Sequence, residues 1–231
     1  MALVFLYGAN MSSIRLNGPD QMAGLAAPMG LALTVEEFEL DFTCMSRRHA
    51  CGIADLTPFP ESPLRGVFRG DPFPESHKTL TGECFGGTPI LRKPALSVSE
   101  TPSQKTVSEA ISHRGRKIYG VLYDIPDDRV FRNSQVDWQL LDDIEDEGGT
   151  HQRREIQVVL IGVPSGYEDK PISALSYCAK KPEPFLKTEL HYVIHLLEGL
   201  REFSAPPEYI DYVKFRIIRT TPKLALALDK F

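Results

Sequence analysis

Two short segments of the sequence contain residues that could do chemistry. An apolar run, Leu3–Leu6, leads directly into Tyr7-Gly8-Ala9-Asn10-Met11, and much later in the chain Glu147 precedes two glycines, with Arg153 following. A strand that ends in a glycine turn exposes consecutive backbone N–H groups, which can bind a carboxylate. An acidic residue before glycines can serve as a base. Together the two segments predict an enzyme for a small anionic substrate.

The composition indicates one folded domain without a nucleic-acid partner. A chain of 231 residues can bury one substantial core, and we predict a single domain over 1–231. With 42% hydrophobic residues, 25% charged residues and a net charge of −5, it lacks the basic excess that nucleic-acid binding usually brings. The apolar start is too short for a signal sequence or a membrane span. We therefore expect a cytoplasmic protein that binds no membrane, and a homodimer is left open.

Neither the cysteines nor the histidines have the spacing of a metal site. The four cysteines are scattered and form no CxxC pair, so free thiols are expected: Cys44, Cys51, Cys84 and Cys178. His191 and His195 are the one close histidine pair, but no acidic residue follows the first of them as in a zincin motif. Phosphate-loop and dinucleotide fingerprints are also absent from the sequence. We predict no metal and no cofactor.

The patterning predicts strands and helices that would position the two segments. Alternation and β-branched content favour strands at 3–7, 35–42, 52–56, 118–125, 155–163 and 173–179. Helical periodicity favours helices at 135–145, 187–203 and 208–215, and a short helix after the turn, up to Leu16. Strands in the middle and helices at the end indicate an α+β architecture.

One long segment interrupts this pattern. Residues of about 61–117 are rich in Pro, Gly, Ser and Thr, and structureless loops of this length are uncommon inside compact domains. We interpret the segment as a loop-rich insertion that covers the pocket as a lid and governs which acceptor group enters it.

Several segments, in order, make the chain similar to a known family. Tyr7-Gly8-Ala9-Asn10 is close to Tyr-Gly-Ser-Asn, and the segments at 38–42 and 52–56 are close to Phe-x-Leu-Asp-Phe and Gly-Ile-Ala-x-Ile. Gly120–Tyr123, the Glu-Gly pair, Tyr177 in its strand and the tail from Leu200 to Tyr212 follow in register. In these segments the chain resembles the γ-glutamyl cyclotransferase family over most of its length apart from 60–117. The resemblance implies a mixed β-barrel core with flanking helices.

The resemblance also implies an activity. Enzymes of this family let the α-amine of a γ-glutamyl substrate attack its own side-chain carbonyl, which gives 5-oxoproline and a free amine. A glutamate must move the proton, and the substrate carboxylate needs N–H donors, but no metal or organic cofactor is required. Some fungal relatives trim γ-glutamyl groups from glutathione-derived intermediates of secondary metabolite biosynthesis. The implied partner is therefore a small γ-glutamyl molecule.

The site residues follow from the same comparison of motifs. Glu147 is the first choice for the catalytic base, because Gly148, His151 and Arg153 then fall at the family's spacing. Glu145 is the second choice. With Glu145 as the base, Leu141-Asp142 lies where many relatives carry Leu-Asp, but no glycine follows the glutamate. The substrate-binding residues are expected to be Tyr7, Gly8, Ala9, Asn10, Met11 and Tyr177.

Two departures and two other functions stay open. Ala9 replaces the usual serine and removes a hydroxyl, and His151 stands where an aromatic residue is common in the family. The tyrosines Tyr7 and Tyr177 could instead serve core packing with satisfied hydroxyls. The pocket and its glutamate would also suit a cofactor-free cyclase or isomerase of a biosynthetic intermediate, and the fold would suit a non-catalytic binding protein.

If Glu147 is the base, Glu147→Gln abolishes turnover and leaves the fold intact.

Overall fold

The structure is a computed structural model that describes residues 1–58, 116–131, 140–162 and 170–231. Residues 1–65 and 114–231 belong to one compact unit, which is described by itself. The expected insertion at 61–117 lies outside the described residues except at its last two positions, so the lid stays a prediction. The first part of the expected helix at 135–145 also lies outside them.

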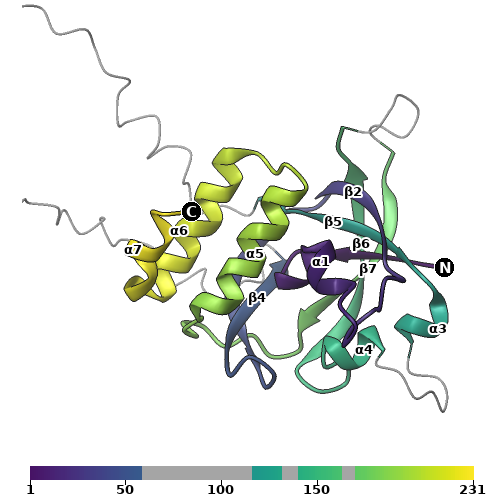
Figure 1. The fold of residues 1–231 in the computed structure, drawn as a ribbon, viewed down its shortest axis with the longest axis horizontal. Coiled ribbons are helices and arrows are strands. Elements are labelled where there is room, and N and C mark those ends of the chain that lie inside the picture. Colours follow the sequence, from purple (N-terminus) through teal and green to yellow (C-terminus); the bar gives the residue numbers. More distant parts are fainter. Residues whose placement is uncertain (59–115, 132–139, 163–169) are drawn as a thin grey trace, which may run out of the picture. The chain divides into compact units, whose positions relative to one another are not determined.

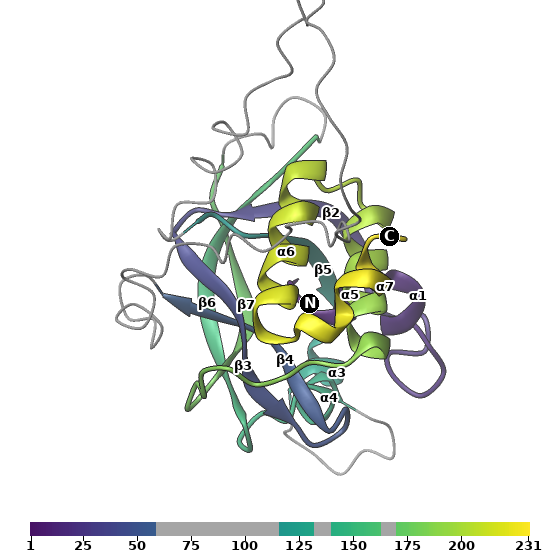
Figure 2. The ribbon, with the colours of Figure 1, turned by 90° about the vertical axis from the view of Figure 1, so that its left-hand side faces the viewer.

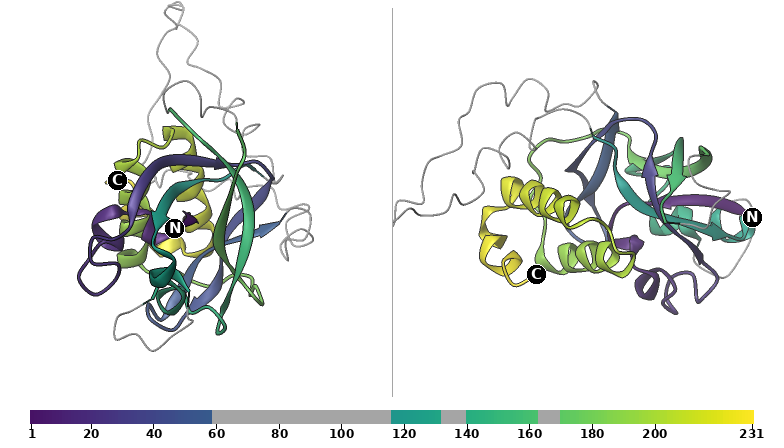
Figure 3. Two further views of the ribbon diagram at one scale, coloured as in Figure 1. Left: turned by 90° about the vertical axis from the view of Figure 1, so that its right-hand side faces the viewer. Right: turned by 90° about the horizontal axis from the view of Figure 1, so that it is seen from above.

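A closed barrel of mixed strand direction forms the centre of this unit. Its strands are, in order around the barrel, β1 (Ala2–Leu6), β5 (Tyr119–Ile125), β2 (Ala27–Thr34), β6 (His151–Leu160) and β7 (Ile172–Ala179). Neighbours are antiparallel except β1 and β7, which are parallel and close the barrel where Val4 pairs with Leu175. Figure 3 shows the ribbon of the barrel from two further sides. Closure leaves no free edge strand in the barrel. The α+β class with a mixed barrel core is therefore confirmed.

One barrel strand, β2, has no counterpart among the predicted strands. Its sequence contains Pro28 and Gly30, which lower strand propensity, and the register shifts between them as the strand pairs with β5. Long-range pairing with β5 on one side and β6 on the other compensates for this weak local preference. The strand could not be predicted from local patterning alone.

A separate hairpin of β3 (Phe38–Ser46) and β4 (Cys51–Pro58) carries a polar turn. Both strands are longer than the predicted ones at 35–42 and 52–56, and the two meet at the pair Ser46 and Cys51. The turn at 47–50 includes Arg47, Arg48 and His49, and ends at Ala50, whose φ of 50° is in the left-handed region. The hairpin therefore holds three basic side chains at its tip.

Two long helices flank the sheets. α5 (Leu190–Glu202) and α6 (Pro207–Thr220) lie side by side, with α5 against the short 3-10 helix η1 (Ala9–Met11) and α6 against β3 (Figures 1 and 2). They match the predicted helices at 187–203 and 208–215. A Cβ on Gly199 would lie 2.8 Å from Cβ of Met11, so only glycine allows α5 to approach the glycine turn this closely. η2 (Pro222–Leu224) and α7 (Ala225–Leu228) complete the C-terminal part.

Three short helices complete the described unit. α1 (Ser13–Leu16) follows the turn as expected, α3 (Asp127–Val130) follows β5, and α4 (Leu141–Ile144) precedes β6. Among the described residues, no helix has both the length and the apolar character needed to cross a membrane.

Candidate active site

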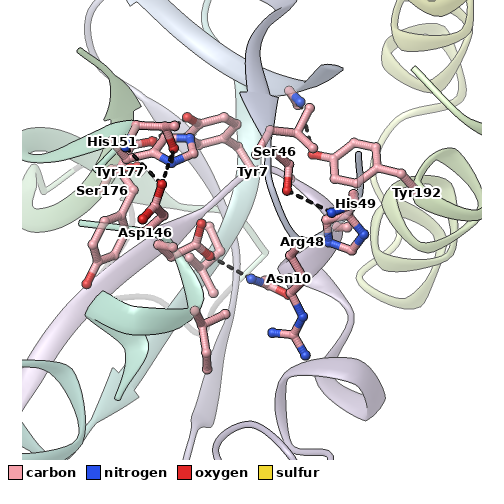
Figure 4. A pocket seen from close by; sticks show the side chains of 18 of the residues that line it. Tyr7, Asn10, Ser46, Arg48, His49, Asp146, His151, Ser176, Tyr177 and Tyr192 are labelled. Atoms are coloured by element: carbon pink, nitrogen blue, oxygen red, sulfur yellow. Dashed lines mark hydrogen bonds between the residues drawn. The ribbon is translucent and has the colours of Figure 1, made fainter. Parts of the chain in front are cut away.

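A cavity of about 190 Å³ opens where β1 ends and the glycine turn begins (Figure 4). Its walls come from the turn after β1, the tip of the β3–β4 hairpin, the loop after α4, β7 and α5. The volume is below the roughly 300–1,000 Å³ of pockets that hold drug-sized ligands, which suits a small substrate. The elements that form it are far apart in sequence, and barrel closure brings them together.

Glu145 is the glutamate that lines this cavity. It follows the last residue of α4, and its Oε1 accepts a 2.6 Å hydrogen bond from Nδ2 of Asn10. The side chain is partly buried. The structure thus brings a carboxylate of the acidic segment to the glycine turn, which is the juxtaposition that the predicted chemistry requires.

Glu147 is not among the residues that line the cavity. Its Oε1 lies 3.9 Å from Nε of Arg153, so it faces a partly exposed arginine. The chain reverses in this loop, where Asp146, between the two glutamates, adopts the left-handed region with φ of 52°, and Gly148, after Glu147, does so with φ of 84°. Of the two candidate bases, Glu145 therefore lines the cavity and Glu147 does not.

Asp146 organises this reversal. Its Oδ2 accepts hydrogen bonds from the backbone N–H and the hydroxyl of Thr150, at 2.9 Å and 2.8 Å. Burial opposes the charged form of Asp146, but the two Thr150 hydrogen bonds and the nearby Arg47 outweigh it and lower the pKa of the carboxyl. The ionised Asp146 thus keeps the loop in the conformation that directs Glu145 toward Asn10 and Glu147 toward Arg153.

The two predicted tyrosines line the cavity, but their hydroxyls have protein partners. Tyr7 Oη donates a 2.5 Å hydrogen bond to the backbone carbonyl of Tyr177, and Tyr177 Oη donates a 2.8 Å hydrogen bond to Asp142. Asp142 is fully buried and also lies 3.7 Å from Nε of Arg153. These bonds connect the turn after β1 with β7 and α4. Burial raises the pKa of both tyrosines, so they stay neutral.

The glycine turn presents part of its backbone to the cavity. The N–H of Met11 donates to the carbonyl of Gly8 at 3.0 Å. A Cβ on Gly8 would lie 2.9 Å from the hydroxyl of Tyr192. Gly8, Ala9 and Asn10 line the cavity, whereas the fully buried Met11 packs behind it.

Several basic residues of the site were not predicted from the sequence. Arg15 of α1 and the hairpin-tip residues Arg48 and His49 line the cavity, and all three also line a larger outer hollow of about 1010 Å³. The far wall of this hollow is the face of α5 that carries His191 and His195. A basic turn between two predicted strands was the available signal, but nothing local indicated that the turn lies beside the glutamate.

The remaining polar residues of the cavity were also missed as site residues. They are Ser46, Arg47, Asp143, Asp146, Thr150, His151, Ser176 and Tyr192. Ser176 Oγ donates to the carbonyl of Phe5, and Tyr192 Oη accepts from the N–H of Ala54 (Figure 4 shows both side chains). These two residues hold the walls of the cavity together.

The thiols are unsuited to nucleophilic chemistry. Cys44, Cys51 and Cys178 are free and buried, and burial raises the pKa of Cys44 and of Cys178 to about 12. A thiol in such a setting stays protonated and inert. Within the described ranges, no group of His, Cys, Asp and Glu has the arrangement of a metal site, and freedom from metals and cofactors stays a prediction.

His49 makes the stability of the fold depend on pH. Burial and the neighbouring Arg15, His191, Arg48 and His195 lower its pKa from 6.5 to about 4. Because the unfolded chain binds this proton more readily, the contribution of neutral His49 is complete above pH 6.5 and is lost as the pH falls toward 4. We expect the free energy of unfolding, measured by urea titration, to fall across this range more steeply for the wild type than for His49→Gln. Parallel profiles for the two proteins would contradict this expectation.

Comparison with solved structures identifies the fold class. A structure named gamma-glutamyl cyclotransferase matches with a TM-score of 0.54 and 18% identity, over 92% of this chain and 86% of that one. An uncharacterized protein from Homo sapiens, loc79017, matches with a TM-score of 0.55, 18% identity and the same two coverages. YkqA from Bacillus subtilis matches with a TM-score of 0.54 and 17% identity, over 94% of this chain but 54% of its own length.

These matches show that the chain has the γ-glutamyl cyclotransferase-like fold, as the sequence motifs predicted. No protein-family model matches the chain, and no curated protein matches it significantly. At such identities the likeness concerns the fold, so the activity has to be argued from the site.

Proposed function

We propose that this protein is a γ-glutamyl cyclotransferase-like enzyme that releases 5-oxoproline from a γ-glutamyl amide without a cofactor. The observation that carries the proposal is the Glu145 carboxylate inside a small cavity, held by Asn10 of a glycine turn at the end of a barrel strand. The γ-glutamyl cyclotransferase-like fold supports the same reaction class.

The proposed reaction needs one group that accepts and returns a proton. The neutral α-amine of the substrate attacks the side-chain carbonyl carbon and forms the C–N bond of the lactam ring. Glu145 takes a proton from this nitrogen and passes it to the amide nitrogen of the leaving amine. The bond between the carbonyl carbon and that amide nitrogen then breaks, which leaves 5-oxoproline and a free amine. Protons and bonds balance, and Glu145 returns to its starting state.

The turn at the end of β1 is our proposed binding site for the glutamyl group. The backbone N–H groups of Gly8, Ala9 and Asn10 would bind the α-carboxylate, because that of Met11 already donates to the carbonyl of Gly8. Tyr7 and Tyr177 would form the wall without donating their hydroxyls to the substrate. The outer hollow beyond Arg15 and His49 offers room for the acceptor group, which is the part of the substrate attached to the γ-glutamyl group.

The direct test is an assay of the full chain with γ-glutamyl amino acids and with glutathione, in which 5-oxoproline is measured. We expect release of 5-oxoproline by the wild type and none by Glu145→Gln. Consumption of a substrate without 5-oxoproline would favour the cyclase or isomerase alternative. Calorimetric binding without any turnover would favour a non-catalytic binding protein. The cytoplasmic location and the homodimer stay predictions.

A further inference from the structure

A line of hydrogen bonds runs from Glu145 to the tip of the β3–β4 hairpin. Asn10 Nδ2 donates to Glu145 Oε1 at 2.6 Å, and Asn10 Oδ1 accepts from Arg15 Nε at 3.1 Å. Arg15 Nη2 in turn lies 3.0 Å from Nε2 of His49. Asn10 is thus the link between the glutamate and the guanidinium.

The chemistry of the end groups fixes the orientation of the Asn10 amide. A guanidinium only donates hydrogen bonds and an ionised carboxylate only accepts them. A flipped amide would place its NH₂ against Arg15 and its oxygen against Glu145, and both bonds would be lost. Arg15 therefore determines which end of Asn10 faces the glutamate.

His49 supports the far side of the guanidinium. Because Arg15 can only donate, Nε2 of His49 must accept, and the proton of the neutral ring must be on Nδ1. The lowered pKa of His49 agrees with this neutral form. The backbone N–H of His49 donates to the hydroxyl of Ser46 at 3.1 Å, so the hairpin tip is itself held in place.

We propose that Arg15 is a positioning residue which, through Asn10, fixes the rotamer of Glu145 and leaves Oε2 of the carboxylate to exchange the proton with the substrate. The inference rests on the proposed function for its catalytic consequence, but the hydrogen-bonded line can be tested without turnover. Arg15 acts here without touching the reacting atoms.

The kinetic test compares Arg15→Met, Asn10→Ala and the double variant, with 5-oxoproline release as the readout. A misplaced base costs rate more than substrate affinity, so we expect kcat to fall about 10-fold to 100-fold in each single variant, with little change in KM. Because both residues act through one line, the double variant should be no slower than the slower single variant. Arg15→Lys, which can still donate to Asn10, should recover part of kcat.

Two controls separate positioning from a general loss of structure or charge. Arg154→Met removes a positive charge from an exposed position on β6 outside the cavity, and it should keep the kcat of the wild type. Asn10→Asp keeps an oxygen toward Arg15 but replaces the donor that faces Glu145, so kcat should fall although the side chain is nearly isosteric. Wild-type kcat in Asn10→Asp, a KM effect alone in Arg15→Met, or multiplied effects in the double variant would overturn the proposal.

A measurement without substrate keeps the two proposals distinguishable. In a ¹⁵N-labelled protein, the side-chain amide of Asn10 should give a shifted, slowly exchanging pair of N–H signals, and Arg15→Met should move them toward the values of a solvated amide. Unchanged Asn10 signals in Arg15→Met would overturn the positioning role. No 5-oxoproline from the wild type, together with the expected signal change, would instead overturn the proposed function alone.

Discussion

Glu145→Gln is expected to lower kcat for 5-oxoproline release by about 10²-fold to 10⁴-fold, the range that a general acid–base group contributes. The amide of glutamine is nearly isosteric with the carboxylate but cannot accept the proton of the attacking amine. It can still accept the hydrogen bond of Asn10 through its oxygen, so the cavity and the fold should be kept. Steady-state kinetics and circular dichroism of the same preparation measure the two effects.

Glu147→Gln is the matched control, because it makes the same chemical change two residues away in the same loop. Glu147 faces Arg153 at 3.9 Å and does not line the cavity, so we expect kcat to stay within a few-fold of the wild type. If Glu147→Gln lost activity and Glu145→Gln kept it, the catalytic base would be Glu147, the first choice from the sequence motifs. Each outcome identifies one residue as the base.

Asp41→Ala is expected to have the largest effect on stability. Asp41 of β3 and Arg216 of α6 form a 2.6 Å ion pair, and their side chains are only 6% and 7% exposed. Removing one partner of a buried pair typically costs about 3–5 kcal/mol, because the other charge remains buried. Glu39 also attracts the Arg216 charge, so we expect the lower end, about 3 kcal/mol. In a chain of this size that corresponds to a fall in Tm of about 6–12 °C.

The exposed pair of Lys223 and Glu189 provides the comparison. Their atoms lie 2.8 Å apart, yet the side chains are 59% and 44% exposed. In urea titrations of both variants, Glu189→Ala should therefore lower the free energy of unfolding much less than Asp41→Ala does. The double variant Asp41→Leu with Arg216→Met removes both buried charges and should recover most of the loss of Asp41→Ala. Equal effects of Asp41→Ala and Glu189→Ala would show that the buried pair does not anchor α6.

The local sequence determined most of the elements. Alternating or continuous apolar runs predicted β1, β3, β4, β5, β6 and β7, and apolar residues at helical spacing predicted α5 and α6. These signals are local because a half-buried strand or helix repeats its own burial pattern along the chain. The motifs around Tyr7–Asn10 and Gly120–Tyr123 further predicted the barrel class, which the comparison of structures confirmed. Strand β2 was not predicted, because its pairing with β5 and β6, rather than its composition, stabilises it.

Only the tertiary structure decided how the site is assembled. The sequence placed both Glu145 and Glu147 in one acidic segment, and spacing alone favoured Glu147. The left-handed conformation of Asp146, held by Thr150, turns one glutamate toward Asn10 and the other toward Arg153. Arg15 and His49 joined the site because barrel closure and the hairpin bring them beside the glycine turn. Side-chain direction at a loop depends on backbone angles and distant partners, and neither leaves a periodic pattern in the sequence.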